Sequence, residues 1–349
     1  MWKYTFERIV LVFITIFIIL SLTYILMKLL PVSKPVGLVP AQIAFYDKQV
    51  ALGYMVKYTD FIPTDQLTAD TIKVVSTNPA HTYYYNYLPI MSQYFSWITN
   101  IFTKWDWGTS TAIKPNASVM SIIGERLPYS VKINIWATLI DIPIGFGLGI
   151  WAAVKKNKPT DTVISTLIMI FISIPSFVLV SFMILVFAYG TGNVSLATWP
   201  ADSAPLSSRV MGYFIPVATL AAGSIAGFTR YTRAELTEVM SNDFMLLART
   251  KGLTKSQAIV RHALRNSGVV LFPMVIGEFI SVLGGSMILE QLYAIPGIGS
   301  LFVTALGRKD YNVVMVDMAM YTAIGLFANL FVDLSYGWID PRIRMGAKK

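Results

Sequence analysis

Asp141 and Glu278 are the residues of this sequence best placed to do chemistry, because each lies near the middle of a long apolar run. An ionised carboxylate is costly inside a bilayer, so acids at this depth usually face a polar cavity or pair with a neighbour. One hypothesis is that either acid lines a path through which a solute crosses the membrane. The alternative is a structural role, in which each acid pairs with a neighbouring helix or a partner subunit. Asp317 lies near the end of its run, and we expect it to face water.

Several common kinds of chemistry are missing from the sequence. Without cysteine, the chain has no disulfide, thiolate metal site or cysteine nucleophile. It contains no G-x-x-x-x-G-K-S/T phosphate loop and no H-E-x-x-H zinc motif. The two histidines, His81 and His262, fall in segments that the charge pattern places on opposite sides of the membrane, so they cannot share a metal or assist one serine. We therefore predict no catalytic residue, no metal site and no cofactor.

The composition indicates a membrane protein. Of 349 residues, 55% are hydrophobic and 13% are charged, whereas charged residues make up about a quarter of a soluble domain. A membrane-spanning helix needs about 20 apolar residues, and six runs meet this requirement. The first is too long for the apolar part of a signal peptide, so we expect it to be retained as an anchor. The predicted spans are 9–30, 131–154, 163–188, 211–228, 268–289 and 313–338.

Lysine and arginine in the short loops predict the orientation of these spans. With the N-terminus inside, the cytoplasmic segments hold 16 of these residues, against 4 in the short external segments. Both termini are therefore predicted to be cytoplasmic. The net charge of +9 suits loops that face an anionic leaflet, and it does not indicate nucleic-acid binding. The cytoplasmic segments are 1–8, 155–162, 229–267 and 339–349.

These observations predict an all-α polytopic fold in four parts. Residues 1–30 form the cytoplasmic N-terminus and first span, 31–124 an external segment, 125–345 a five-helix core, and 346–349 a cytoplasmic tail. We expect the external segment to be a small subdomain, mostly of helix and loop. Its aromatic residues are either interfacial anchors or a docking surface for an external partner, and the two interpretations are compatible. Gly145, Gly147 and Gly149 are interpreted as a helix-packing surface and not as a nucleotide site.

The cytoplasmic loop 229–267 contains a well-marked short helix. Asn242 or Asp243 is a good N-cap, and Lys251 and Gly252 suit the end of the helix. Thr254 and Gln257 form a capping box for the helix that follows. One face of the short helix is apolar, at the i, i+3, i+4 positions Phe244, Leu247 and Ala248.

A helix of about two turns is marginal alone, and nothing obvious in this chain buries its apolar face. A groove on a soluble partner would stabilise it. On spacing alone, an amphipathic helix lying on the lipid surface is an equal alternative.

This loop resembles the EAA loop of ABC-importer permeases, in which an alanine-rich stretch, three residues and a glycine precede a second helix. The matching stretch here runs from Leu246 to Gly252. It is closest to the form in dipeptide and oligopeptide permeases, where ARxKGL is followed by RHALRN, here 248–253 and 261–266. Further patches extend the resemblance over roughly 120–345, whereas 31–105 departs from the family. These patches are 126–128, Asp161, 174–177, 295–299, 308–311, Asn329, Asp333, Tyr336 and 340–342.

The resemblance implies a type I ABC importer with two membrane subunits, two cytoplasmic ATPases and an external peptide-binding protein. This chain would be one membrane subunit and not an enzyme, and peptide would cross the cell membrane beside it. The residues expected to contact an ATPase are Asp243, Phe244, Leu247, Ala248, Lys251 and Gly252. A secondary transporter that uses Asp141 and Glu278 as ion sites is the rival hypothesis, although no inverted repeat supports it. An intramembrane hydrolase is a third option, weakened by the missing catalytic pairs.

The predicted topology can be tested with single cysteines, because the native chain has none. Cysteine at Ser76 should react with an impermeant maleimide in intact cells, whereas cysteine at Ser256 should react only after permeabilisation. The reverse pattern would invert the orientation of every span.

Overall fold

The computed structural model describes residues 2–30, 35, 38–77 and 79–339. The predicted tail 346–349 and the motif at 340–342 lie outside the described residues. The chain divides into two compact units. The first comprises Met1–Val12, Leu127–Ser300 and Ile324–Lys349, and the second comprises Phe13–Arg126 and Leu301–Ala323. Each unit is described by itself.

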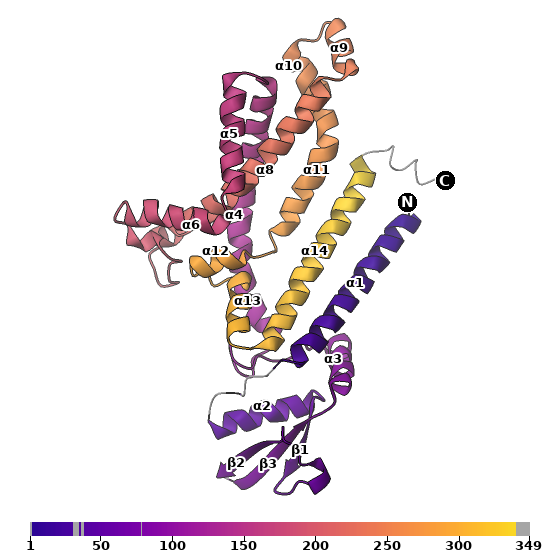
Figure 1. The fold of residues 1–349 in the computed structure, drawn as a ribbon, viewed down its shortest axis with the longest axis vertical. Helices are drawn as coiled ribbons and strands as arrows, with labels where there is room; N and C mark the ends of the chain where they lie inside the picture. The colour runs from indigo at the N-terminus through magenta and orange to yellow at the C-terminus, as the bar shows by residue number, and fades with distance from the viewer. Residues whose placement is uncertain (1, 31–34, 36–37, 78, 340–349) are drawn as a thin grey trace. The chain divides into compact units, whose positions relative to one another are not determined.

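Long apolar helices dominate the described residues (Figure 1). Five regions are long and apolar enough to cross a membrane, and a sixth span exists if one bent pair of helices is counted as one. This number agrees with the prediction of a polytopic helical protein with six spans. The helices of the five regions are α1 (Trp2–Lys28), α4 (Val119–Val154), α7 and α8 (Leu206–Met211 and Phe214–Met240), α10 to α11 (Lys255–Ala258 through Leu264–Ser281) and α14 (Tyr311–Ile339).

Two of the predicted spans are interrupted. The third consists of α5 (Pro159–Ser173), α6 (Ser176–Met183) and the π-helical turn η2 (Ile184–Tyr189), and the axis bends by 100° between α5 and α6. Pro175 lies at the bend, where proline removes a backbone donor and disfavours helix in the residue before it. The fifth span ends at Ser281 instead of Leu289, because the chain breaks before α12 (Met287–Leu292) and then enters α13 (Ile298–Gly307).

In the first unit, α4 and α8 approach each other closely at two glycines. A Cβ on Gly145 would meet the Cβ of Phe228, and a Cβ on Gly149 would lie 2.5 Å from the Cβ of Thr232. Gly147 is exposed, and a Cβ there would meet nothing within 4 Å. The predicted helix-packing surface is therefore confirmed for Gly145 and Gly149 and is wrong for Gly147.

The second unit contains a sheet that was not expected from the sequence. Strands β1 (Met55–Thr59), β2 (Ile72–Thr77) and β3 (Ala80–Tyr87) pair antiparallel in the order β1-β3-β2. Around it lie α2 (Val39–Ala51), the short turn η1 (Thr64–Gln66) and α3 (Ile90–Lys104). Segment 31–124 is thus a mixed subdomain, and the expectation of mostly helix and loop is corrected.

Part of the aromatic cluster forms the core of this unit. Tyr85 on β3 is fully buried and stacks on Tyr46 of α2, with ring centroids 5.0 Å apart. Trp97 of α3 stacks on Tyr24 of α1, with ring centroids 4.6 Å apart. Neither interfacial anchoring nor docking describes these buried rings, whereas Trp105 is exposed and remains compatible with either role. Aromatic pairs of this kind add about 0.5–1.5 kcal/mol beyond the area they bury.

The close approach of α4 to α8 gives a matched pair of variants. Gly149→Val should lower the melting temperature of the detergent-solubilised protein, because overpacking typically costs about 1–3 kcal/mol. Gly147→Val carries the same change in helix propensity at an open position and should melt close to wild type. Equal melting temperatures for the two variants would contradict the close contact at Gly149.

Candidate functional site

The short helix predicted in loop 229–267 is present as α9 (Asp243–Thr250), with Asn242 as its N-cap residue. It ends in a Schellman motif, in which Gly252 N–H donates to Arg249 O at 3.0 Å and Leu253 N–H to Ala248 O at 3.3 Å. Gly252 has φ +92°, as the sequence predicts. Asn242 makes no side-chain capping hydrogen bond, so the loop fixes the C-terminal end of α9.

A capping box starts the next element. Gln257 N–H donates to Thr254 Oγ1 at 3.3 Å, and the Gln257 side chain accepts from Thr254 N–H at 3.0 Å. The chain continues from α10 through the π-helical turn η4 (Ile259–Ala263) into α11. The capping box therefore begins an element that runs without a break from α10 into a membrane helix.

The apolar face of α9 differs from the predicted one. Met245 and Ala248 are buried, and they pack in a cluster with Leu236, Ala258 and Ile259 of the same chain. The expectation that nothing in the chain buries this helix is therefore wrong for Ala248. The signal that was missed is the i, i+3 pair of Met245 and Ala248, which defines a face rotated from the predicted one.

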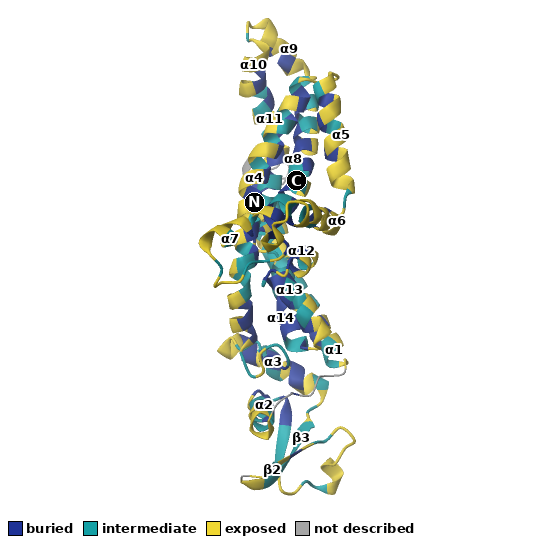
Figure 2. Cartoon of the chain, turned by 90° about the vertical axis from the view of Figure 1, so that its left-hand side faces the viewer, coloured by how far each residue is buried: buried dark blue, intermediate teal, exposed yellow. Residues whose placement is uncertain are grey.

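The outward side of α9 nevertheless carries large apolar residues. Leu246 is 65% exposed, Leu247 is 55% exposed and Phe244 is 37% exposed. Asp243, Lys251 and Gly252 also lie on the exposed surface. Figure 2 shows the resulting mixture of buried and exposed residues along α9. A groove of about 310 Å³ adjoins the helix and is lined by residues that include Asn242, Leu246, Arg249, Lys255 and Ile259.

The two intramembrane acids come together between α4, α8 and α11. Ser224 Oγ donates to Glu278 Oε1 at 3.0 Å, and Asp141 lies close enough to interact electrostatically with Glu278. Asp141 is 1% exposed, and its Oδ1 has no hydrogen-bond partner among the described residues. Asp317 is buried in the other unit, which corrects the expectation that it faces water. Asp333, the remaining acid of the predicted sixth span, forms a salt bridge with Arg8, and its Oδ2 lies 3.1 Å from Arg8 Nη1.

A third acid, Glu290, was missed in the sequence although it precedes the 295–299 motif. It is 2% exposed, and its carboxylate accepts from Ser130 Oγ at 2.7 Å, Ser300 N at 3.0 Å and Ser286 N at 3.2 Å. Gly297 packs directly against Glu290 and Ser130, where a Cβ would clash. The glycine of the motif therefore makes room for a buried carboxylate.

Two further motif residues hold the chain together at the ends of helices. Asp161 of α5 accepts two hydrogen bonds from Arg233 of α8: Nε donates to Oδ1 at 2.5 Å, and Nη2 donates to Oδ2 at 2.8 Å. In the second unit, Asp310 is fully buried, and its Oδ2 accepts from Ser110 Oγ at 2.5 Å and from the backbone N–H groups of 111–113 at 2.8–3.0 Å. Both residues have positioning roles that explain their motifs without contact to a substrate.

Comparison with known proteins extends these observations over the whole chain. Residues 145–345 match the family described as binding-protein-dependent transport system inner membrane component. The chain is 32% identical over 351 residues to the dipeptide transport system permease protein DppB of Bacillus subtilis (strain 168), with all of both proteins covered. It is 31% identical over 256 residues to the oligopeptide transport system permease protein OppB of Escherichia coli (strain K12), which covers 73% of this chain and 81% of that protein.

Among solved structures, the chain is similar to an inward-facing form of the MetNI methionine ABC transporter. The TM-score is 0.49 at 17% identity, over 63% of this chain and 97% of that chain. Segment 31–105, which departs from the family patches, is nevertheless included in the full-length match to the Bacillus subtilis protein.

The end of α9 gives a prediction about conformation. Gly252→Val should reduce function, because a β-branched residue at φ +92° adds strain of about 1–2 kcal/mol and redirects α10. Gly252→Asn should be tolerated much better, since asparagine visits the left-handed region more readily. Solute uptake by cells that express each variant at equal level is the measurement. Equal uptake by the two variants would exclude the need for a positive φ.

Proposed function

Because the chain belongs to the binding-protein-dependent transport system inner membrane component family, we propose that it is one membrane-spanning subunit of an ATP-driven importer of dipeptides or oligopeptides. The names of its relatives from Bacillus subtilis and Escherichia coli support a peptide as the solute. The chain is a multi-pass protein of the cell membrane and a transport subunit. ATP hydrolysis belongs to two cytoplasmic partner subunits, and a second homologous permease completes the translocation path.

The observation that carries this proposal is the exposed apolar surface of α9. Leu246 and Leu247 lie on a helix whose C-terminal end is fixed by the Schellman motif and whose inner face already packs on the chain. A soluble loop gains nothing from exposing two leucines, whereas a groove on an ATPase would bury them. The motif match at 246–252 supports the same partner.

The construction of the loop suits the transmission of force. ATP binding closes a pair of ATPase subunits, and α9 follows that motion as a rigid body. Met245 and Ala248 connect the inner face of α9 to Leu236 of α8, while the capped α10 continues into α11. A displacement of α9 is therefore transmitted to α8 and α11. The path between the two permease subunits then opens alternately to the two sides of the membrane.

Asp141 and Glu278 are proposed to face the translocation path. They lie on α4 and α11 with Ser224 of α8 between them, so three helices of the first unit contribute polar groups at one place. The unpartnered Oδ1 of Asp141 is buried within the chain, so a contact with a solute requires the surrounding helices to move apart during transport. The carboxylates would favour the ammonium group of a passing peptide.

The sheet subdomain of the second unit is proposed to lie outside the membrane and to dock the external peptide-binding protein. Helix α2 packs on one face of the sheet, where Tyr46 stacks on Tyr85. On the opposite side of β2, Lys73 and Val75 are exposed. An exposed sheet face of this kind is available to a protein partner.

Substitution of Leu247 tests the docking of α9. Leu247→Glu places a charge in the proposed contact, and loss of one central contact typically costs about 2 kcal/mol or more. Co-purification of the ATPase subunits in mild detergent and peptide uptake should therefore fall together, by about thirtyfold in affinity. Leu67→Glu is the control, because Leu67 is a leucine of similar exposure in the external unit. Retained co-purification with Leu247→Glu would exclude the contact. Ala248 is unsuitable for this test, since its burial within the chain would confound folding with docking.

An ion-coupled secondary transporter is the second candidate, and the convergence of Asp141 and Glu278 is the observation that favours it. The double variant Asp141→Asn, Glu278→Gln separates the two functions, because it keeps the size of both side chains and removes both titratable groups. An ATP-driven importer should keep ATP-dependent peptide uptake in this variant, with altered peptide preference. Uptake that collapses with a protonophore at constant ATP, and is abolished in the double variant, would overturn the proposed function.

A further inference from the structure

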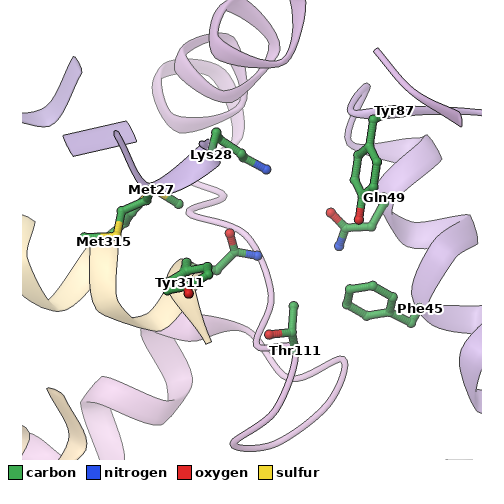
Figure 3. A pocket seen from close by; sticks show the side chains of 9 residues that line it. Met27, Lys28, Phe45, Gln49, Tyr87, Thr111, Tyr311 and Met315 are labelled. Atoms are coloured by element: carbon green, nitrogen blue, oxygen red, sulfur yellow. The ribbon is translucent and has the colours of Figure 1, made fainter. Parts of the chain in front are cut away.

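A small, largely apolar pocket in the second unit has a lysine at its edge (Figure 3). Its volume is about 30 Å³, which is room for about two water molecules. Figure 3 shows the Lys28 ammonium and the Gln49 amide directed toward the same space. The lining residues are Met27, Lys28, Phe45, Gln49, Tyr87, Thr111, Tyr311, Asn312 and Met315.

Two groups in this pocket lack the partner that their chemistry calls for. Lys28 Nζ lies 5.0 Å from the ring centroid of Tyr54 and 5.5 Å from that of Tyr24, and no carboxylate within the described ranges pairs with it. Aromatic faces attract a cation but carry no formal charge. Thr111 is 6% exposed, and its Oγ1 is buried without a hydrogen-bond partner in the described part of the chain. Buried polar groups are normally satisfied, so each such exception calls for a ligand or water.

The polar groups and the walls of the pocket select the ligand. One cation and one free hydroxyl match a monoanion, such as a carboxylate with its two oxygens. Three apolar side chains of the pocket would contact carbon atoms of the ligand, which favours an organic carboxylate over chloride. They are Met27, Phe45 and Met315. A hydrogen bond from a charged donor is stronger than one between neutral groups, especially away from water.

A larger groove adjoins the pocket and shares Lys28 and Tyr87 with it. Its volume is about 830 Å³, within the range of sites for small organic ligands. Among the described residues that line it, Lys28 is the only base and Asp70 the only acid. This pair is complementary to the two ends of a zwitterionic peptide.

We propose that Lys28 and Thr111 bind the terminal carboxylate of a short peptide, whose remaining residues lie in the adjoining groove. The site would hold a peptide on the external unit of the permease before it enters the membrane. The choice of a peptide as the source of the carboxylate rests on the proposed function, whereas the carboxylate site itself rests on the pocket.

Modification of Lys28 by an amine-reactive reagent provides a direct test. The full chain in nanodiscs of neutral lipid is labelled, and the rate at each lysine is measured by mass spectrometry. Saturating trialanine should slow labelling of Lys28 at least tenfold, whereas trialanine amide should leave the rate unchanged. Lys104, an exposed lysine at the end of α3, should label equally in all samples.

Acetate and chloride test which features of the ligand protect Lys28. Acetate should protect Lys28 only at much higher concentration than trialanine, because acetate does not occupy the groove. Equal potency of acetate and trialanine would overturn the role of the groove. Protection by chloride at the same concentration would overturn the carboxylate assignment. Protection by anionic lipid in place of peptide would identify Lys28 as a headgroup contact.

Thr111→Val keeps the shape of the side chain and removes the hydroxyl. About tenfold more trialanine should then be needed for half-protection of Lys28, the change expected for one lost hydrogen bond to a charged group. Thr103→Val is the matched control, because Thr103 is exposed on α3 and donates to its own helix. An unchanged requirement in Thr111→Val would remove Thr111 from the site. Binding is measured without ATP or partner subunits, so its loss with normal peptide uptake would overturn this inference and leave the proposed function standing.

Discussion

The hydrocarbon core of a bilayer offers no hydrogen-bond partner to a peptide group, and this constraint governs the construction of the first unit. Unbroken helices satisfy the constraint by themselves. The chain departs from helix between α11 and α12, and there polar side chains replace the missing backbone bonds. Asn134 Nδ2 donates to Val282 O at 3.2 Å and also to Gly284 O. Glu290 accepts from the backbone of Ser286 and Ser300. A broken helix is stable here because the protein supplies what water cannot.

Helix α4 supplies much of this support along one side. Ser130 and Asn134 form hydrogen bonds with the non-helical segment between α11 and α12 and with Glu290. Asp141 approaches Glu278, and Gly145 and Gly149 allow α8 to pack closely. The spacing of these five residues keeps them on one face of a helix. The same face therefore performs three tasks: it completes a broken span, it brings the acids together, and it allows the close approach of a neighbour. A change to α4 should consequently affect several sites at once.

Loop 229–267 solves a different physical problem. A helix of two turns is unstable alone, yet the proposed coupling role requires α9 to stay folded while its partner moves. The structure stabilises α9 through Met245 and Ala248 on its inner face, through the Schellman motif at its end and through the capping box that follows. The outer leucines are thereby left free for a partner. Because α9 is already folded before it meets a partner, no binding free energy is spent on ordering the helix, and more of it stabilises the contact.

The number of spans, their order and the ends of α9 could be predicted from sequence, because each depends on local features. Apolar length determines which segments suit a bilayer, and the residues at 252, 254 and 257 determine caps through bonds within a few residues. The external sheet was missed because its strands are short and β3 is completed by partners on both sides. The bend at Pro175 was missed because the surrounding run is apolar throughout. Only the tertiary structure decided that Ala248 faces inward, that Asp317 is buried, and that Glu290 meets Ser130 from 160 positions away. Such contacts join residues distant in the chain, and the chemistry of a single residue does not specify which partner folding brings to it.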